Sequence, residues 1–90
     1  MLSEEKYDKA IELYTCAIDL NPSKSAYFGN RSFAHLKIEF YGSALEDATQ
    51  AISLDKTYIK GYYRRAAAYF AMGKFKLALK DFEAVSTLKV

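Results

Sequence analysis

Two cations, Lys60 and Arg64, stand four residues apart within a stretch, Tyr58 to Ala67, that otherwise has the pattern of a helix. At this spacing two like charges lie on one helix face and repel each other, at a cost of about 0.2–0.5 kcal/mol. Folding alone gains nothing from that arrangement. Because lysine and arginine donate charge-assisted hydrogen bonds to carboxylates, the chemistry that suits the pair is the binding of an anion.

The elements that position these cations recur along the chain as a 34-residue unit. Within each unit the recurring residues are three or four positions apart, which places them on one face of an α-helix. Small residues alternate with large ones on this face, so that neighbouring helices can approach closely and interlock. The recurring sets are Tyr7, Tyr41 and Phe75; Ala10, Ala44 and Ala78; Ile11, Leu45 and Leu79; Tyr14, Ala48 and Phe82; Ala17, Ala51 and Val85; and Leu20, Leu54 and Leu88.

A second type of helix lies between these stretches, at residues 25–38 and 59–72, and its two copies align with the same period. Pro22 ends the first helix, because proline cannot continue a helix. Tight turns separate the other helices. We therefore predict an all-α chain of five helices, one followed by two hairpins. The predicted boundaries are 1–23 for the second helix of a first repeat, 24–57 for a second repeat, and 58–90 for a third without a C-terminal capping helix.

A 34-residue helix–turn–helix unit with these small and large positions resembles the tetratricopeptide repeat. The stretch YDKAIELYTCAIDLNP, residues 7–22, has the tyrosine, alanine, aromatic, alanine and proline typical of that family's second helix. Residues 27–37, 43–67 and 73–83 are similar, nearly residue for residue, to the repeat domain of a serine/threonine phosphatase. The resemblance covers essentially the whole chain and implies a right-handed superhelix. It implies no enzymatic activity, because the phosphatase catalytic domain has no counterpart here.

In this family the first helix of each hairpin lines a concave groove. Asn30 and Arg64 occupy the same position in consecutive units, so we expect them at the same height on adjacent helices, with Lys60 one turn above and Lys37 further along. Neither helix stripe carries an acidic residue, and unbalanced cations in a concavity favour an anion. The alternative is an ordinary solvated face. Gly29, on the same stripe, suits either a close peptide backbone or a crowded helix crossing.

Some members of this family hold the C-terminal carboxylate and last aspartate of heat-shock chaperones that end in Glu-Glu-Val-Asp. The resemblance assigns this role to Asn30, Lys60, Arg64 and Lys37, with Phe33 and Tyr63 as walls for apolar peptide side chains. The implied partners are the chaperones of ninety or seventy kilodaltons. The family's site also takes a lysine and an asparagine from the first helix of the first repeat. We find no substitute in residues 1–6 and expect weaker binding.

Composition argues against several other functions. A net charge of +2 does not indicate a nucleic-acid binder, and no apolar run is long enough to indicate a membrane span. With one cysteine, Cys16, and one histidine, His35, we expect no disulfide, metal site, cofactor or catalytic centre. A single cysteine fits a reducing compartment, so we expect a cytoplasmic protein, with the nucleus as a further location.

Three residues outside the groove carry expectations of their own. We expect His35 near the core, and we expect Arg65 to pair or to snorkel at a helix interface. Glu39 occupies a position where the family often has a turn glycine, so we expect the turn of the second repeat to differ in detail.

Two functions remain open at this point. The first is a binding module for acidic chaperone tails, either a fragment or a paralogue of a phosphatase regulatory domain. The second is a truncated repeat scaffold that self-associates through uncapped ends and has no competent groove, because the ends of repeat arrays normally need polar caps.

Overall fold

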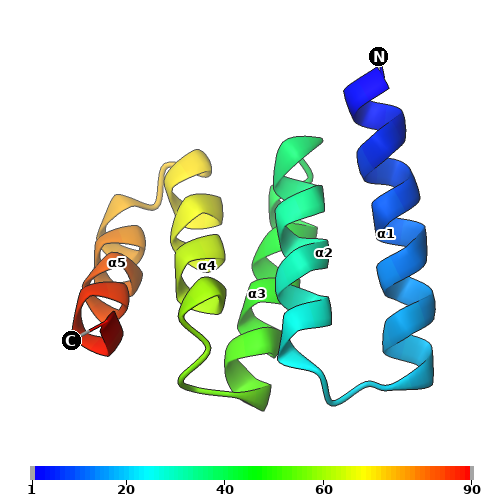
Figure 1. The fold of residues 1–90 in the computed structure, drawn as a ribbon. Coiled ribbons are helices and arrows are strands. Elements are labelled where there is room, and N and C mark those ends of the chain that lie inside the picture. Colours follow the sequence, from blue (N-terminus) through cyan, green and yellow to red (C-terminus); the bar gives the residue numbers. More distant parts are fainter. Residues whose placement is uncertain (1, 90) are drawn as a thin grey trace.

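Helices account for most of residues 2–89, which the computed structural model describes (Figure 1). Helices α2 and α3 form one antiparallel hairpin and α4 and α5 form another, while α1 packs against α2 at one end of the array. This arrangement confirms the predicted all-helical fold. The helices described are α1 (Leu2–Leu20), α2 (Ser25–Lys37), α3 (Tyr41–Leu54), α4 (Ile59–Ala71) and α5 (Phe75–Lys89).

Small residues form most of the core between the helices. Ala44, Ala48 and Ala51 on α3 have no exposed surface, and neither does Ala66 on α4. Side chains of this size let two helix backbones approach closely, which is how the alanines of the 34-residue pattern act. Ser32 is also fully buried, and its hydroxyl donates to the carbonyl oxygen of Ala44 at 2.7 Å, so the polar group is not left unpaired.

The loops that join one unit to the next share one hydrogen-bonding pattern. In the first loop Asn21 Oδ1 accepts from the backbone nitrogen and hydroxyl of Ser23, at 3.3 and 2.9 Å. Asp55 Oδ1 accepts from the same two groups of Thr57, at 2.9 and 2.7 Å, and these bonds lower the pKa of the Asp55 carboxyl. Side chains of Asn and Asp that bond two residues ahead are a common device for making a turn.

The turns inside the two hairpins have the same backbone conformation. Gly73 has φ of 78°, and Glu39, at the matching position of the preceding unit, has φ of 65° although it is not glycine. The backbone hydrogen bonds also match, because Phe40 N donates to His35 O and Lys74 N donates to Tyr69 O, both at 2.8 Å. The expectation that the turn at Glu39 would differ is therefore wrong. The turn bonds impose the left-handed conformation on Glu39 despite its side chain.

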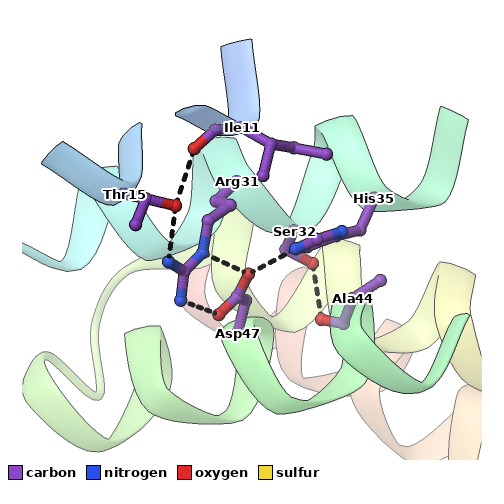
Figure 2. A network of polar contacts seen from close by, with 7 residues as sticks. All are labelled: Ile11, Thr15, Arg31, Ser32, His35, Ala44 and Asp47. Carbon is purple, nitrogen blue, oxygen red and sulfur yellow. Dashed lines mark hydrogen bonds and ion pairs between the residues drawn. The ribbon is translucent and has the colours of Figure 1, made fainter. Parts of the chain in front are cut away.

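One arginine–aspartate pair joins the two helices of each hairpin. Arg31 on α2 donates to both carboxylate oxygens of Asp47 on α3, each at 2.8 Å (Figure 2). Arg65 on α4 does the same to Asp81 on α5, at 2.8 and 2.9 Å, which confirms the predicted interface position of Arg65. Both aspartates are buried, and a buried carboxylate is stable only with such a partner. We call these two contacts the hairpin ion pairs.

The first hairpin ion pair belongs to a larger polar network. Arg31 Nη1 donates to Thr15 Oγ1 at 3.1 Å, and that hydroxyl donates to the carbonyl oxygen of Ile11 at 2.7 Å (Figure 2). His35 Nε2 lies 3.4 Å from Asp47 Oδ2, and the histidine side chain is 13% exposed, which agrees with its predicted place near the core. The network therefore joins α1, α2 and α3.

Candidate functional site

Helices α2 and α4 lie next to each other on one side of the array, with α3 behind them (Figure 1). The six predicted site residues lie on these two helices. Helix α2 carries Asn30, Phe33 and Lys37, and helix α4 carries Lys60, Tyr63 and Arg64. We call this surface the α2–α4 groove.

The structure brings Arg64 directly onto Phe33. The Cζ atom of Arg64 lies 4.5 Å from the centre of the Phe33 ring and 5.9 Å from the centre of the Tyr63 ring. Lys37 Nζ also lies over the Phe33 ring, at 5.2 Å. Aromatic faces attract cations at such distances. Phe33 is therefore the residue around which cations of both helices gather.

Tyr63 and Lys60 are more exposed than Arg64. The Tyr63 ring meets Phe82 of α5 edge to face, with centres 6.0 Å apart, and half of the residue is exposed. Lys60 is exposed one helical turn from Arg64. The structure thus places Tyr63 between the groove and α5.

Arg64 differs from the other two arginines in its partners. Among residues 2–89, the ion pairs of arginine and lysine side chains are the two hairpin ion pairs, which involve Arg31 and Arg65. The Nε atom of Arg64 is buried and has no hydrogen-bond partner within the described part of the chain. Arg64 is therefore a half-buried cation whose charge no carboxylate of the described residues balances.

Gly29 is explained by helix packing. A Cβ atom on this residue would lie 2.7 Å from Cε2 and 2.9 Å from Cζ of Tyr58, which is closer than such atoms can approach. Burial raises the pKa of the Tyr58 hydroxyl, against the opposing effect of the Arg64 charge. Of the two explanations that the sequence left open, the structure supports the crowded helix crossing.

A cavity of about 230 Å³ extends the site toward α1, which the sequence analysis missed. Asn30 and Phe33 line it from α2, and Lys6 and Tyr7 line it from α1. The sequence analysis found no substitute for the missing residues in positions 1–6, and Lys6 of this segment lines the same cavity as Asn30. Lys6 is not one of the recurring positions, and its spacing of four residues before Ala10 was the only hint in the sequence.

Cys16 is exposed. No group of three or more histidine, cysteine, aspartate or glutamate side chains within residues 2–89 is arranged to hold a metal ion. In the same residues, no helix has both the length and the apolar character required to cross a bilayer.

Known proteins share this fold. Residues 59–88 match the family model described as tetratricopeptide repeat. The chain also superimposes, with a TM-score of 0.90 and 42% identity, on the structure of the second tetratricopeptide-repeat domain of Spaghetti (RPAP3) bound to the HSP90 peptide SRMEEVD. The match covers 97% of this chain and 81% of that one. The chain belongs to the tetratricopeptide-repeat family.

Two further relatives of this tetratricopeptide-repeat chain are informative. It is 60% identical over 83 residues to serine/threonine-protein phosphatase 5 of Homo sapiens, a match that covers 92% of the chain but 17% of the phosphatase. The second tetratricopeptide-repeat domain of human RPAP3, in complex with the HSP70 peptide SGPTIEEVD, superimposes with a TM-score of 0.89 and 42% identity, covering 97% of this chain and 72% of that one. The chain thus corresponds to the repeat region of the phosphatase and not to its full length.

Proposed function

We propose that the α2–α4 groove binds the acidic C-terminal tail of a heat-shock chaperone, ending in Glu-Glu-Val-Asp with a free carboxylate. The observation that carries the proposal is Arg64, a half-buried cation on an aromatic ring with no acidic partner among the described residues. A peptide carboxylate supplies the missing charge, and hydrogen bonds between ionised groups are the stronger kind.

The remaining groove residues have complementary roles in this proposal. Lys60 and Arg64 donate to the carboxylates, and the Asn30 amide adds a neutral donor. Lys37 contributes positive charge beside the Phe33 ring, and Lys6 contributes positive charge to the cavity that it lines together with Asn30. The rings of Phe33 and Tyr63 offer apolar surface to the peptide side chains.

Relatives support the choice of ligand. Two structures of the second RPAP3 domain, which is 42% identical to this chain, were determined with peptides of HSP90 and HSP70 that end in Glu-Val-Asp preceded by a further glutamate. The similarity to phosphatase 5 is confined to a region that makes up 17% of that protein. We therefore propose that this region contributes binding and not catalysis, and that it acts in the cytoplasm or nucleus.

The proposed boundaries follow the 34-residue pattern. Residues 1–23 form the second helix of one repeat, 24–57 a second repeat and 58–90 a third. This division assigns α1 to the first unit and one hairpin to each of the others.

A peptide titration tests the proposal. A labelled Met-Glu-Glu-Val-Asp peptide is titrated with the 90-residue chain and with its Arg64→Gln variant, and fluorescence anisotropy is measured. We expect Arg64→Gln to weaken binding about 10- to 100-fold, since a hydrogen bond to a charged group contributes about 1.5–3 kcal/mol. Amidation of the peptide C-terminus should weaken binding comparably, and added salt should weaken it as well.

A matched control removes the same charge elsewhere. Lys76→Gln changes an exposed lysine of α5, a helix that carries none of the six groove residues, and should leave affinity within about twofold, because exposed charges are screened by salt. Helix content by circular dichroism should be the same in all three proteins. Equal binding by the original chain, Arg64→Gln and the amidated peptide would refute the proposal.

One observation favours the second function, self-association. An apolar pocket of about 260 Å³ on the α4–α5 side is lined by Phe70, Phe75, Ala78, Leu79 and Phe82. Two of these residues, Phe70 and Phe75, are each 60% exposed. Exposed apolar patches of this kind mark interaction surfaces. Mass in solution, measured with and without peptide, distinguishes the two functions.

A further inference from the structure

Phe33 is the centre of a cluster built from three helices. Arg64 of α4 lies over its ring at 4.5 Å, and Lys37 of α2 lies over it at 5.2 Å. The ring of Tyr7 on α1 meets Phe33 edge to face, with centres 6.2 Å apart and planes 77° apart. The ring is therefore held by α1 while it carries cations of α2 and α4.

The contact with Phe33 restricts how Arg64 can bind a ligand. A guanidinium is planar, and an aromatic face attracts it through the negative charge of the ring. The Nε atom of Arg64 is buried without a hydrogen-bond partner among the described residues. The two terminal nitrogens are therefore the atoms of this side chain through which a partner is bound.

An arginine without such support loses side-chain conformational entropy when it binds a ligand. A free arginine side chain has many rotamers and loses most of them when a ligand fixes it. A side chain that is already fixed loses less on binding, which is the general benefit of preorganisation. Phe33 also attracts Lys37 and Arg64 to one place although their charges repel each other.

We propose that Phe33 is a positioning residue, whose ring orients the Arg64 guanidinium before the ligand arrives and thereby favours a peptide that offers a carboxylate to it. This inference rests on the proposed function and deepens it. It also differs from the role of an apolar wall, because a wall contributes whether or not Arg64 is present, whereas a support for Arg64 contributes only through Arg64.

The first experiment uses this difference. Phe33→Leu keeps an apolar side chain but removes the aromatic face. We expect it to weaken binding of the Met-Glu-Glu-Val-Asp peptide about 3- to 10-fold in the original chain. In the Arg64→Gln background the same substitution should change binding less than about twofold. Equal losses in the two backgrounds would show that Phe33 is only a wall and would overturn the inference.

The second experiment needs no ligand. The Nε–H signal of Arg64 is observed by nuclear magnetic resonance in the free protein, where the ring current of Phe33 should shift it upfield and burial should slow its exchange with water. Phe33→Leu should remove the upfield shift and speed the exchange, whereas Phe33→Tyr, which keeps an aromatic face, should preserve both. Phe75→Leu, the same change on α5, should leave the signal unaltered.

The two experiments distinguish a failure of the proposed function from a failure of the inference about Phe33. If the original chain does not bind the peptide, the proposed function fails, and the Arg64 signal still decides whether Phe33 orients the guanidinium. If the signal is the same in Phe33→Leu as in the original chain, the inference fails even when the peptide binds. Thermal melting of each variant confirms that it is folded under the conditions used.

Discussion

His35 shows how a single side chain depends on the network around it. Its Nε2 atom lies 3.4 Å from Asp47 Oδ2, its Nδ1 atom is buried without a hydrogen-bond partner among the described residues, and its ring stacks on Phe40. Protonation would place a second N–H at Nδ1, where the described residues offer no acceptor. Burial lowers the pKa of His35, and the charge of Arg31 adds to this effect while Asp47 opposes it.

The first prediction concerns the pH dependence of stability. The pKa of His35 is lower in the folded chain than its ordinary value of 6.5, so the unfolded chain takes up the proton first as the pH falls. The contribution of His35 is therefore fully present above pH 6.5 and declines between 6.5 and the lower folded pKa. Chemical unfolding at a series of pH values from 5 to 8 measures this decline.

A substitution isolates the histidine. His35→Tyr introduces tyrosine, the residue type that occupies the equivalent position of the next repeat as Tyr69. It also removes the only histidine of the sequence. The decline between pH 7 and 5 should become shallower in this variant. An identical pH profile for both proteins would mean that other groups cause it.

At the residue scale, the sequence predicts positions better than partners. The predicted places of His35, near the core, and of Arg65, at a helix interface, are confirmed. Their contacts with Asp47 and Asp81 were not predicted, because each aspartate is on the facing helix and no local spacing rule connects it to its partner. The same holds for the contact between Phe33 and Arg64, which requires the relative placement of two helices.

At the scale of elements, the turn of the second repeat carries backbone strain. Glu39 has φ of 65° in the same turn in which Gly73 has φ of 78°. A residue with a Cβ atom pays about 1–2 kcal/mol for this conformation, whereas glycine adopts it readily. Glycine loses more backbone freedom on folding than glutamate does. This loss reduces the stability that a change from glutamate to glycine would add.

The second prediction follows from this comparison. Glu39→Gly should stabilise the chain by about 0.5–1 kcal/mol. In a domain of this size such a change raises the Tm by about 2–8 °C. Differential scanning calorimetry of the variant and the original chain measures the shift.

The reverse substitution is the control. Gly73→Ala leaves open space around the new methyl group, so its effect reports the backbone alone. It should lower the Tm by a similar amount. A Tm that falls in Glu39→Gly would contradict the prediction and would point to a stabilising contact of the Glu39 side chain.

The 34-residue period predicted the number, order and approximate bounds of the helices. The expected helices at 25–38 and 59–72 are observed one residue shorter, as Ser25–Lys37 and Ile59–Ala71. The positive φ of Glu39 was not predicted, although the family often has a glycine at this position, because glutamate rarely adopts it. The hydrogen bonds of the turn prevail over the preference of the side chain.

At the scale of the whole molecule, the fold presents a cationic groove on one side and an apolar surface at the end formed by α4 and α5. Sequence periodicity placed the groove residues on neighbouring helices of one type. It did not reveal the share of α1, because Lys6 lies outside the repeating apolar set and enters the site only through the packing of α1 on α2.

The third prediction concerns association through the apolar surface. Leu79 lines the apolar pocket and is 58% exposed. If this surface joins two copies of the 90-residue chain, the mass by light scattering rises with protein concentration, and Leu79→Lys should reduce that rise by placing a charge in the contact.

Leu77 provides the matched control. It is on the same helix and 45% exposed, but it lines a different pocket, beside Arg65 and Asp81. Leu77→Lys should leave the concentration dependence unchanged. A mass that corresponds to one chain at every concentration would exclude self-association by the original protein.

The hairpin ion pairs have a consequence for how such a chain lengthens in evolution. Each pair joins residues that are 16 positions apart, so both partners fall within one 34-residue unit. A gene segment that encodes one unit therefore encodes a buried charge together with the residue that neutralises it. Tandem duplication of that segment adds a hairpin whose internal electrostatics are already balanced, and selection then has only the new surface between units to adjust.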